Sequence, residues 1–119
     1  MDSIEQANGG SDPFAESFAR LKAVESVAGL VANMAGSSEA GNFILNDAAS
    51  MERAYHDSFP MTRKRFDRGC DDLAKMAQSG AKALLQLKSA GRSHITVAAG
   101  RLMREIHMTG HQTLDLLQK

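Results

Sequence analysis

The stretch FDRGCDDLAKMAQSGAKALLQL, residues 66–87, decides the fold. Its apolar and small side chains recur at alternating steps of four and three residues, which is the heptad spacing of a helix that packs along another helix. The spacing continues for three repeats and predicts a helix over about 60–88, because Pro60 removes a helical hydrogen bond and marks a boundary. The seam positions of this helix are Phe66, Cys70, Leu73, Ala77, Gly80, Leu84 and Leu87.

A first helix is predicted over about 12–35. Asp12 can cap its N-terminus through a backbone hydrogen bond, and Pro13 suits the first helical position because no N–H donor is needed there. Gly36 can end the helix, since glycine readily adopts the left-handed conformation that follows many helices. The apolar stripe between these ends consists of Phe14, Phe18, Leu21, Val24, Ala28 and Val31.

Two further helices are predicted over about 43–59 and about 92–118. The small and polar stretch GSSEAGN, residues 36–42, is typical of a loop and precedes the first of them. The stretch SAGRS, residues 89–93, is typical of a turn and precedes the second. The last helix carries an apolar stripe made of Ile95, Ala99, Leu102, Met103, Ile106, Gly110, Leu114 and Leu117.

These elements predict an all-α fold, an antiparallel bundle of four helices that forms one domain over residues 12–119. The polar segment 1–11 contains a Gly9-Gly10 pair and too little apolar surface to repay ordering, so we expect it to be disordered. The two longest helices, the third and the fourth, should form an antiparallel hairpin that the shorter pair covers incompletely. An uncovered seam would then call for a partner.

The composition limits the classes of function. Lys plus Arg and Asp plus Glu number 14 each, so no overall charge attracts nucleic acid or an acidic membrane surface. Cys70 is the only cysteine, which excludes an intrachain disulfide and suits a reducing cytoplasm. No stretch approaches the roughly 20 apolar residues that span a bilayer, and we see no cleavable signal peptide. We expect a cytoplasmic protein without a cofactor.

A basic cluster lies at the start of the third helix, in the stretch TRKRFDR, residues 62–68. Its cations surround Phe66 and are Arg63, Lys64, Arg65 and Arg68. Such a cluster could contact the phosphates of a nucleic acid, a nucleotide or an acidic lipid. Three aspartates within one turn can pair with cations at helical spacing, and a single aromatic side chain offers little base stacking. The aspartates are Asp67, Asp71 and Asp72, and the cations with which they can pair are Arg63, Arg68 and Lys75.

A solvated, charged face is therefore the favoured interpretation of this cluster, and nucleic acid is not the expected partner. One feature stays unexplained on that interpretation. The cations lie near a helix N-terminus, where the helix dipole disfavours positive charge. An acidic element of a partner would remove this conflict.

The stretch IHMTGHQTLD, residues 106–115, places His107, His111 and Asp115 at four-residue intervals. A helical pair of histidines can bind zinc, but catalytic motifs of this kind have a glutamate next to the first histidine, where this sequence has Met108. At about 100° per residue the three side chains lie from the edge to the far side of the apolar stripe. We therefore expect a solvated helix face and no native metal site.

No arrangement of residues indicates an enzyme. The neighbours Tyr55, His56 and Asp57 point about 100° apart on a helix, so they cannot converge on one substrate atom. Cys70 occupies a seam position, where we expect it to be inert core. The sequence has no nucleophile elbow and no glycine-rich phosphate loop.

Several glycines fall inside predicted helices, each at a cost of about 1 kcal/mol relative to alanine. Gly80 and Gly110 lie on apolar stripes, which favours a close approach of two helices at these points. Elsewhere on the stripes the expected core and seam side chains are Leu73, Leu84, Leu87, Leu102, Ile106 and Leu117.

The leading hypothesis for function is a small non-enzymatic helical module that works by self-association or by docking the helices of another protein. In composition and helix layout the chain resembles phasins, the coat proteins of bacterial storage granules, and the resemblance implies an amphipathic coat as an alternative. A second alternative is an anion-binding or nucleic-acid-binding regulator that uses the cluster at 63–68.

Overall fold

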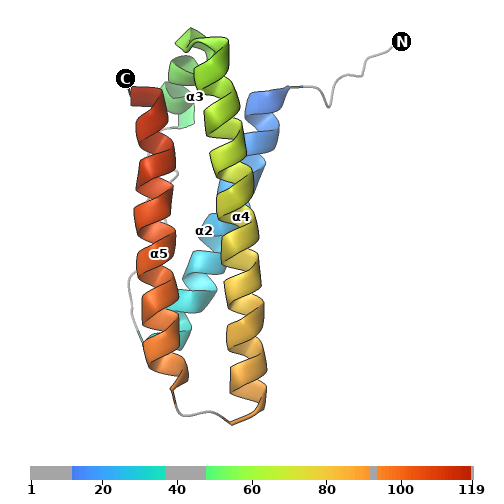
Figure 1. The fold of residues 1–119 in the computed structure, drawn as a ribbon, viewed down its shortest axis with the longest axis vertical. Helices are drawn as coiled ribbons and strands as arrows, with labels where there is room; N and C mark the ends of the chain where they lie inside the picture. Colours follow the sequence, from blue (N-terminus) through green and yellow to red (C-terminus); the bar gives the residue numbers. More distant parts are fainter. Residues whose placement is uncertain (1–11, 37–47, 92–93, 119) are drawn as a thin grey trace, which may run out of the picture.

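The computed structural model describes residues 12–36, 48–91 and 94–118, and this part of the chain contains four α-helices and a final 3₁₀ turn (Figure 1). The expected all-α helical bundle is confirmed. The elements in chain order are α2 (Pro13–Met34), α3 (Ala48–Asp57), α4 (Pro60–Ser89), α5 (Ile95–Asp115) and η2 (Leu116–Gln118).

The three long helices lie along one another, and α3 caps one end (Figure 1). Helix α5 runs antiparallel to α4, as expected for a hairpin, and also antiparallel to α2. Helices α2 and α4 run in the same direction, because α3 and the start of α4 lie at the end where α2 begins. Alternate helices of an up-and-down antiparallel bundle run in the same direction, so this pair agrees with the expected topology.

The local signals of the first helix act as expected. The Asp12 carboxylate accepts a hydrogen bond of 3.1 Å from the backbone N–H of Phe14, and Pro13 occupies the first helical turn. Gly36 follows the helix with a φ of +74°, a conformation that side chains disfavour. Gly91, at the turn after α4, has a φ of +71° for the same reason.

Some expectations fall outside the described residues. These are the disorder of segment 1–11, most of the loop at 36–42 and the first residues of the helix expected over 43–59. The part of that helix that is described begins at Ala48 and ends at Asp57, directly before the boundary at Pro60.

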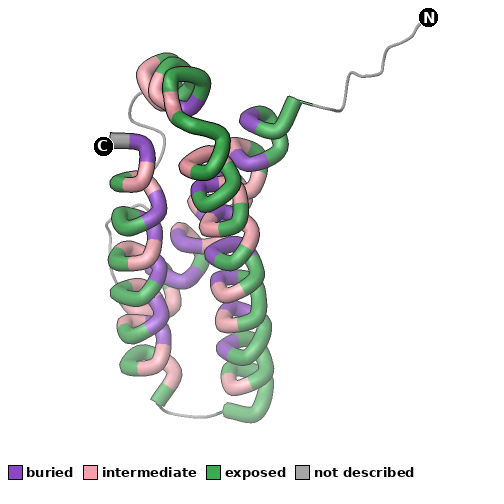
Figure 2. The backbone as a smooth tube through the Cα atoms, turned by 45° about the horizontal axis from the view of Figure 1, so that its top comes forward, coloured by how far each residue is buried: buried purple, intermediate pink, exposed green. Residues whose placement is uncertain are grey.

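The heptad seam of α4 forms the centre of the core. Phe66, Cys70, Leu73 and Ala77 are fully buried, and Leu84 is nearly so, whereas Leu87 is half-buried. Figure 2 shows that the buried residues of each long helix follow its inner face. The core residues that the other helices contribute include Leu21, Val24, Ala28, Val31, Ala99, Leu102, Ile106 and Leu117.

The seam is covered over most of its length, and the expected incomplete coverage is limited to the end near Leu87, which is half-buried. Helix α2 packs against both α4 and α5 and closes the seam between them. With 22 residues it is about 33 Å long, enough to cover most of the 30-residue α4. The bundle therefore buries its main apolar stripes without a partner.

At Gly80 the side chain of Leu102 on α5 fills the space beside the seam. A β-carbon at this position would lie 2.7 Å from both methyl carbons of Leu102 on α5. Gly110 is also buried. Gly29 and Gly100 face open space instead, so the close-approach argument does not extend to them.

Among the helices of the described ranges, none combines the length and the apolar character needed to cross a membrane.

Candidate interaction surface

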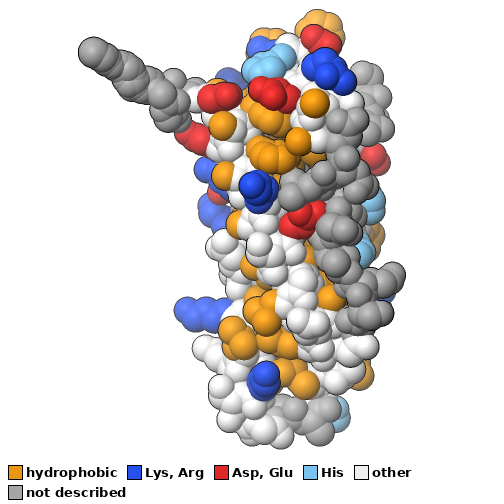
Figure 3. Space-filling view, turned by 180° about the vertical axis from the view of Figure 1, so that it is seen from behind, with side chains coloured by type: hydrophobic (Ala, Val, Ile, Leu, Met, Phe, Trp, Pro, Cys, Tyr) orange, Lys and Arg blue, Asp and Glu red, His pale blue; other side chains and the backbone are white. Residues whose placement is uncertain are grey.

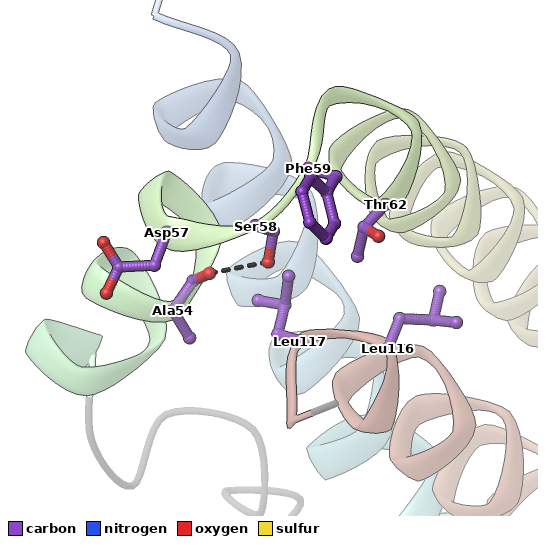
Figure 4. Close-up of a pocket in the computed structure, with 7 residues that line it drawn as sticks. All are labelled: Ala54, Asp57, Ser58, Phe59, Thr62, Leu116 and Leu117. Atoms are coloured by element: carbon purple, nitrogen blue, oxygen red, sulfur yellow. Dashed lines mark hydrogen bonds between the residues drawn. The ribbon is translucent and has the colours of Figure 1, made fainter.

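The corner between α3 and α4 exposes two large apolar side chains. Phe59 is 80% exposed and Met61 is 65% exposed. Phe59 has an extended backbone, and Pro60 after it begins α4, so the chain turns sharply here. Ser58 closes the end of α3 by donating a hydrogen bond of 2.7 Å from Oγ to the carbonyl oxygen of Ala54 (Figure 4).

Beside this corner lies a mixed apolar and polar pocket of about 400 Å³. In Figure 4 Leu116 and Leu117 extend from η2 toward the start of α4, while the carboxylate of Asp57 points away from these leucines. The side chain of Phe59 forms part of the wall of this pocket. The complete lining consists of Ala54, Asp57, Ser58, Phe59, Thr62, Leu116 and Leu117.

Arg63 explains why a cation stands at the start of α4. Its Nη1 donates hydrogen bonds to the carbonyl oxygens of Ser58, at 2.6 Å, and of His56, at 3.4 Å. These carbonyls lie at the end of α3, where the helix dipole favours positive charge. The expected pairing of Arg63 with an aspartate is therefore not what the structure shows, and for Arg63 no acidic partner element is required.

The remaining cations of the cluster are exposed, and in the described part of the chain none of the three forms an ion pair. The expected pairing of Arg68 is therefore absent there, whereas Asp71 does bind Lys75, at 2.9 Å, and also Arg20 on α2, at 3.4 Å. At 100° per residue the three cations share a sector of about 100° with Met61 on the outward face of α4. We call Phe59, Met61, Lys64, Arg65 and Arg68 the basic corner.

A second surface lies between the start of α2 and α3. It is a shallow pocket of about 430 Å³ with an apolar floor that includes Phe14 and Phe18. Asp12 and Glu52 are the acidic residues of its lining, and Glu52 Oε2 lies 3.8 Å from Nε2 of His56 on the same helix. Figure 3, a view from behind, shows acidic side chains beside hydrophobic ones at this end of the molecule. We call this lining the acidic groove: Asp12, Phe14, Ala15, Phe18, Ala19, Lys22, Ala48, Ala49 and Glu52.

Asp67 ties three helices together. Its carboxylate accepts hydrogen bonds from Ser17 Oγ of α2, at 2.6 Å, and from Tyr55 Oη of α3, at 2.9 Å. Both hydroxyl-bearing residues are buried. From the sequence Asp67 was expected to be a surface charge, because its partners lie 50 and 12 residues away and share no local pattern with it.

The buried groups around Asp67 resist ionisation. Burial raises the pKa of the Cys70 thiol to about 12, and the nearby Asp67 acts in the same direction. Burial also raises the pKa of Tyr55 to about 12, with a further contribution from its hydrogen bond to Asp67. Cys70 is free and fully buried, as expected of an inert core residue.

The free energy of unfolding should therefore fall as the pH rises above about 9. The unfolded chain loses the Cys70 proton near pH 9 and the native chain only near 12, so unfolding releases a proton in this range. We expect Cys70 to account for a loss of about 1 kcal/mol between pH 9 and 10. Urea unfolding of the wild type and of Cys70→Ala at several pH values measures this loss, and equal slopes for the two proteins would contradict it.

The side chains of His107, His111 and Asp115 do not form a metal-binding site. His107 is half-buried, whereas His111 and Asp115 are exposed. Among residues 12–36, 48–91 and 94–118, no three His, Cys, Asp or Glu side chains are placed to hold a metal ion. The neighbours at positions 55–57 also diverge, because Tyr55 is buried while His56 and Asp57 are exposed.

Comparison with known proteins gives no relative. No family model matches the chain, and neither a curated protein nor a solved structure is significantly similar to it.

Proposed function

We propose that the protein is a small, non-enzymatic helical module that acts by self-association or by docking helices of a partner, and that it does so through the basic corner. The observation that carries the proposal is the exposure of Phe59 and Met61 among three cations without ion pairs in the described chain. Aromatic, methionine and arginine side chains are enriched at protein interfaces.

The hydrophobic effect favours burial of the basic corner by a partner. Removing apolar surface from water stabilises a complex by about 25 cal/mol per Å², so a largely exposed phenylalanine has much to gain from a partner. The adjacent pocket of about 400 Å³ offers a site for an apolar side chain of that partner. The flanking cations favour a partner with acidic groups, because opposite charges accelerate encounter and fix the orientation.

The two alternatives fit the structure less well. A coat on a hydrophobic granule needs an exposed apolar face, and α2, α4 and α5 direct their apolar stripes into one core, so this bundle would have to open first. A nucleic-acid regulator is disfavoured because Arg63 is held by the carbonyls of α3 and only Phe59 is exposed for stacking at the corner.

A cytoplasmic location is part of the proposal. It is supported by the single cysteine, which is present as a free thiol.

Site-specific photo-crosslinking tests the proposal. A photoreactive phenylalanine analogue replaces Met61, and in a control protein it replaces Lys82, which is exposed farther along α4. Irradiation in cells that make the protein should give a discrete crosslinked species, either with a second copy or with one other protein, only from position 61. Phe59→Ser in the same chain should reduce its yield. Equal crosslinking from both positions, or none from either, would refute an interaction module at this corner.

A further inference from the structure

We infer that the basic corner binds a second copy of this chain, whose acidic groove receives Phe59 and Met61. The inference rests on the proposed function and names the partner. Both surfaces belong to the same chain, and both lie at the end of the bundle that α3 caps.

The charges of the two surfaces are complementary. The corner presents Lys64, Arg65 and Arg68, and the groove lining presents Asp12 and Glu52. Lys22 is the one cation in the groove lining, so the acidic groups outnumber it. The whole chain has 14 positive and 14 negative side chains, and two copies therefore meet without net repulsion.

The apolar parts also match. The groove floor contains the rings of Phe14 and Phe18, which stack with their centroids 5.6 Å apart. A phenylalanine ring entering from outside can extend this stack, because aromatic pairs favour offset or edge-to-face contact at 4.5–7 Å. The groove is shallow, with a volume of about 430 Å³, so it can receive a side chain that stays partly exposed.

The groove also favours a second copy over an anionic lipid surface. A lipid surface could contact the basic corner, but the acidic groove at the same end of the molecule would be repelled by it. A second copy satisfies both surfaces at once. Two copies related by a two-fold axis exchange corner for groove twice, so the assembly closes as a dimer.

Sedimentation equilibrium of the full chain between about 1 and 500 µM tests the inference, because an interface smaller than a standard one is expected to be weak. The wild type should show a monomer–dimer equilibrium. Reversing the corner charges with Lys64→Glu, Arg65→Glu and Arg68→Glu should weaken the dimer by about tenfold or more, because like charges then face each other. A matched control reverses three exposed cations elsewhere: Lys82→Glu, Lys88→Glu and Arg101→Glu.

Mixing two variants with reversed charges, one at the corner and one at the groove, provides the decisive test. A groove variant with Ala49→Lys and Glu52→Lys, both exposed in the groove lining, should also dimerise about tenfold more weakly on its own. Mixed with the corner variant, it should form a heterodimer of about wild-type affinity, because opposite charges then meet in both contacts. Helical circular dichroism and cooperative thermal unfolding show whether each variant is folded, and Glu52→Gln serves as a milder groove variant.

The outcomes separate this inference from the proposed function. A wild-type chain that stays monomeric throughout the range, while position 61 crosslinks to another protein, overturns the second copy and leaves the interaction module standing. A dimer that the corner and groove variants do not weaken overturns the inference, since another surface then forms it. Failure of the mixed variants to associate, or binding of the wild-type monomer to phosphatidylglycerol vesicles that the corner variant loses, also overturns it.

Discussion

Leu73→Ala should lower the free energy of unfolding by about 2–5 kcal/mol. Leu73 is fully buried at the centre of the α4 seam, between α2 and α5. Truncation removes the transfer energy of the lost methyl and methylene groups and leaves a cavity that rigid neighbouring helices fill only in part. Chemical denaturation monitored by helical circular dichroism measures the change.

Leu85→Ala is the matched control, because Leu85 lies on the same helix and is 44% exposed. It should cost clearly less than the change at position 73, since much of the side chain already contacts water and its loss opens no cavity. Similar small losses at both positions would show that the seam is loosely packed in solution.

Gly80→Leu should destabilise the protein by about 1–3 kcal/mol through overpacking. The first carbon of any side chain at this position meets the Leu102 methyl groups at 2.7 Å, so Leu102 must move even before the rest of the new side chain is placed. The intrinsic helix propensity acts in the opposite direction by up to about 1 kcal/mol. The sign of the measured change therefore reports whether α4 and α5 are in close contact.

Gly100→Ala provides the control for helix propensity alone. A β-carbon at Gly100 meets no atom within 4 Å, so this substitution should stabilise by up to about 1 kcal/mol. Urea unfolding of both variants at two protein concentrations gives the comparison. A gain in stability for Gly80→Leu would disprove the packed seam.

The core of the fold could be predicted from the sequence because its signals are local. The heptad spacing of Phe66 through Leu84 and the cap at Asp12 depend only on neighbouring residues, and the structure shows both. How far α2 covers the seam was not predicted, because the apolar stripe of one helix does not tell which other stripe it meets. The position of the short helix α3 at one end of the bundle depends likewise on the path of the whole chain.

The candidate surface was predicted only in part. The cluster of cations is visible in the sequence, but their partners were sought at helical spacing within α4. Arg63 binds the end of the preceding helix, and Asp67 binds hydroxyls of α2 and α3. The exposure of Phe59 was not predicted either, because Phe59 fell within the helix expected over 43–59, whereas α3 ends at Asp57 and Phe59 has an extended backbone.

Helix α3 is attached to the bundle through few contacts: Met51 and Ala54 are only partly buried against the core, and Arg63 bonds the carbonyls at its end. Tyr55 is its only buried residue; it packs against Phe14 and Phe66 and bonds Asp67. Detaching α3 therefore costs less than unfolding the three long helices, which makes it a unit of local unfolding. Because Ala48, Ala49 and Glu52 of α3 form one wall of the acidic groove, its detachment abolishes the groove. Occupancy of the groove and docking of α3 are thus thermodynamically linked. A partner bound in the groove raises the free energy needed to detach α3, and detachment of α3 lowers the binding free energy of that partner by the same amount.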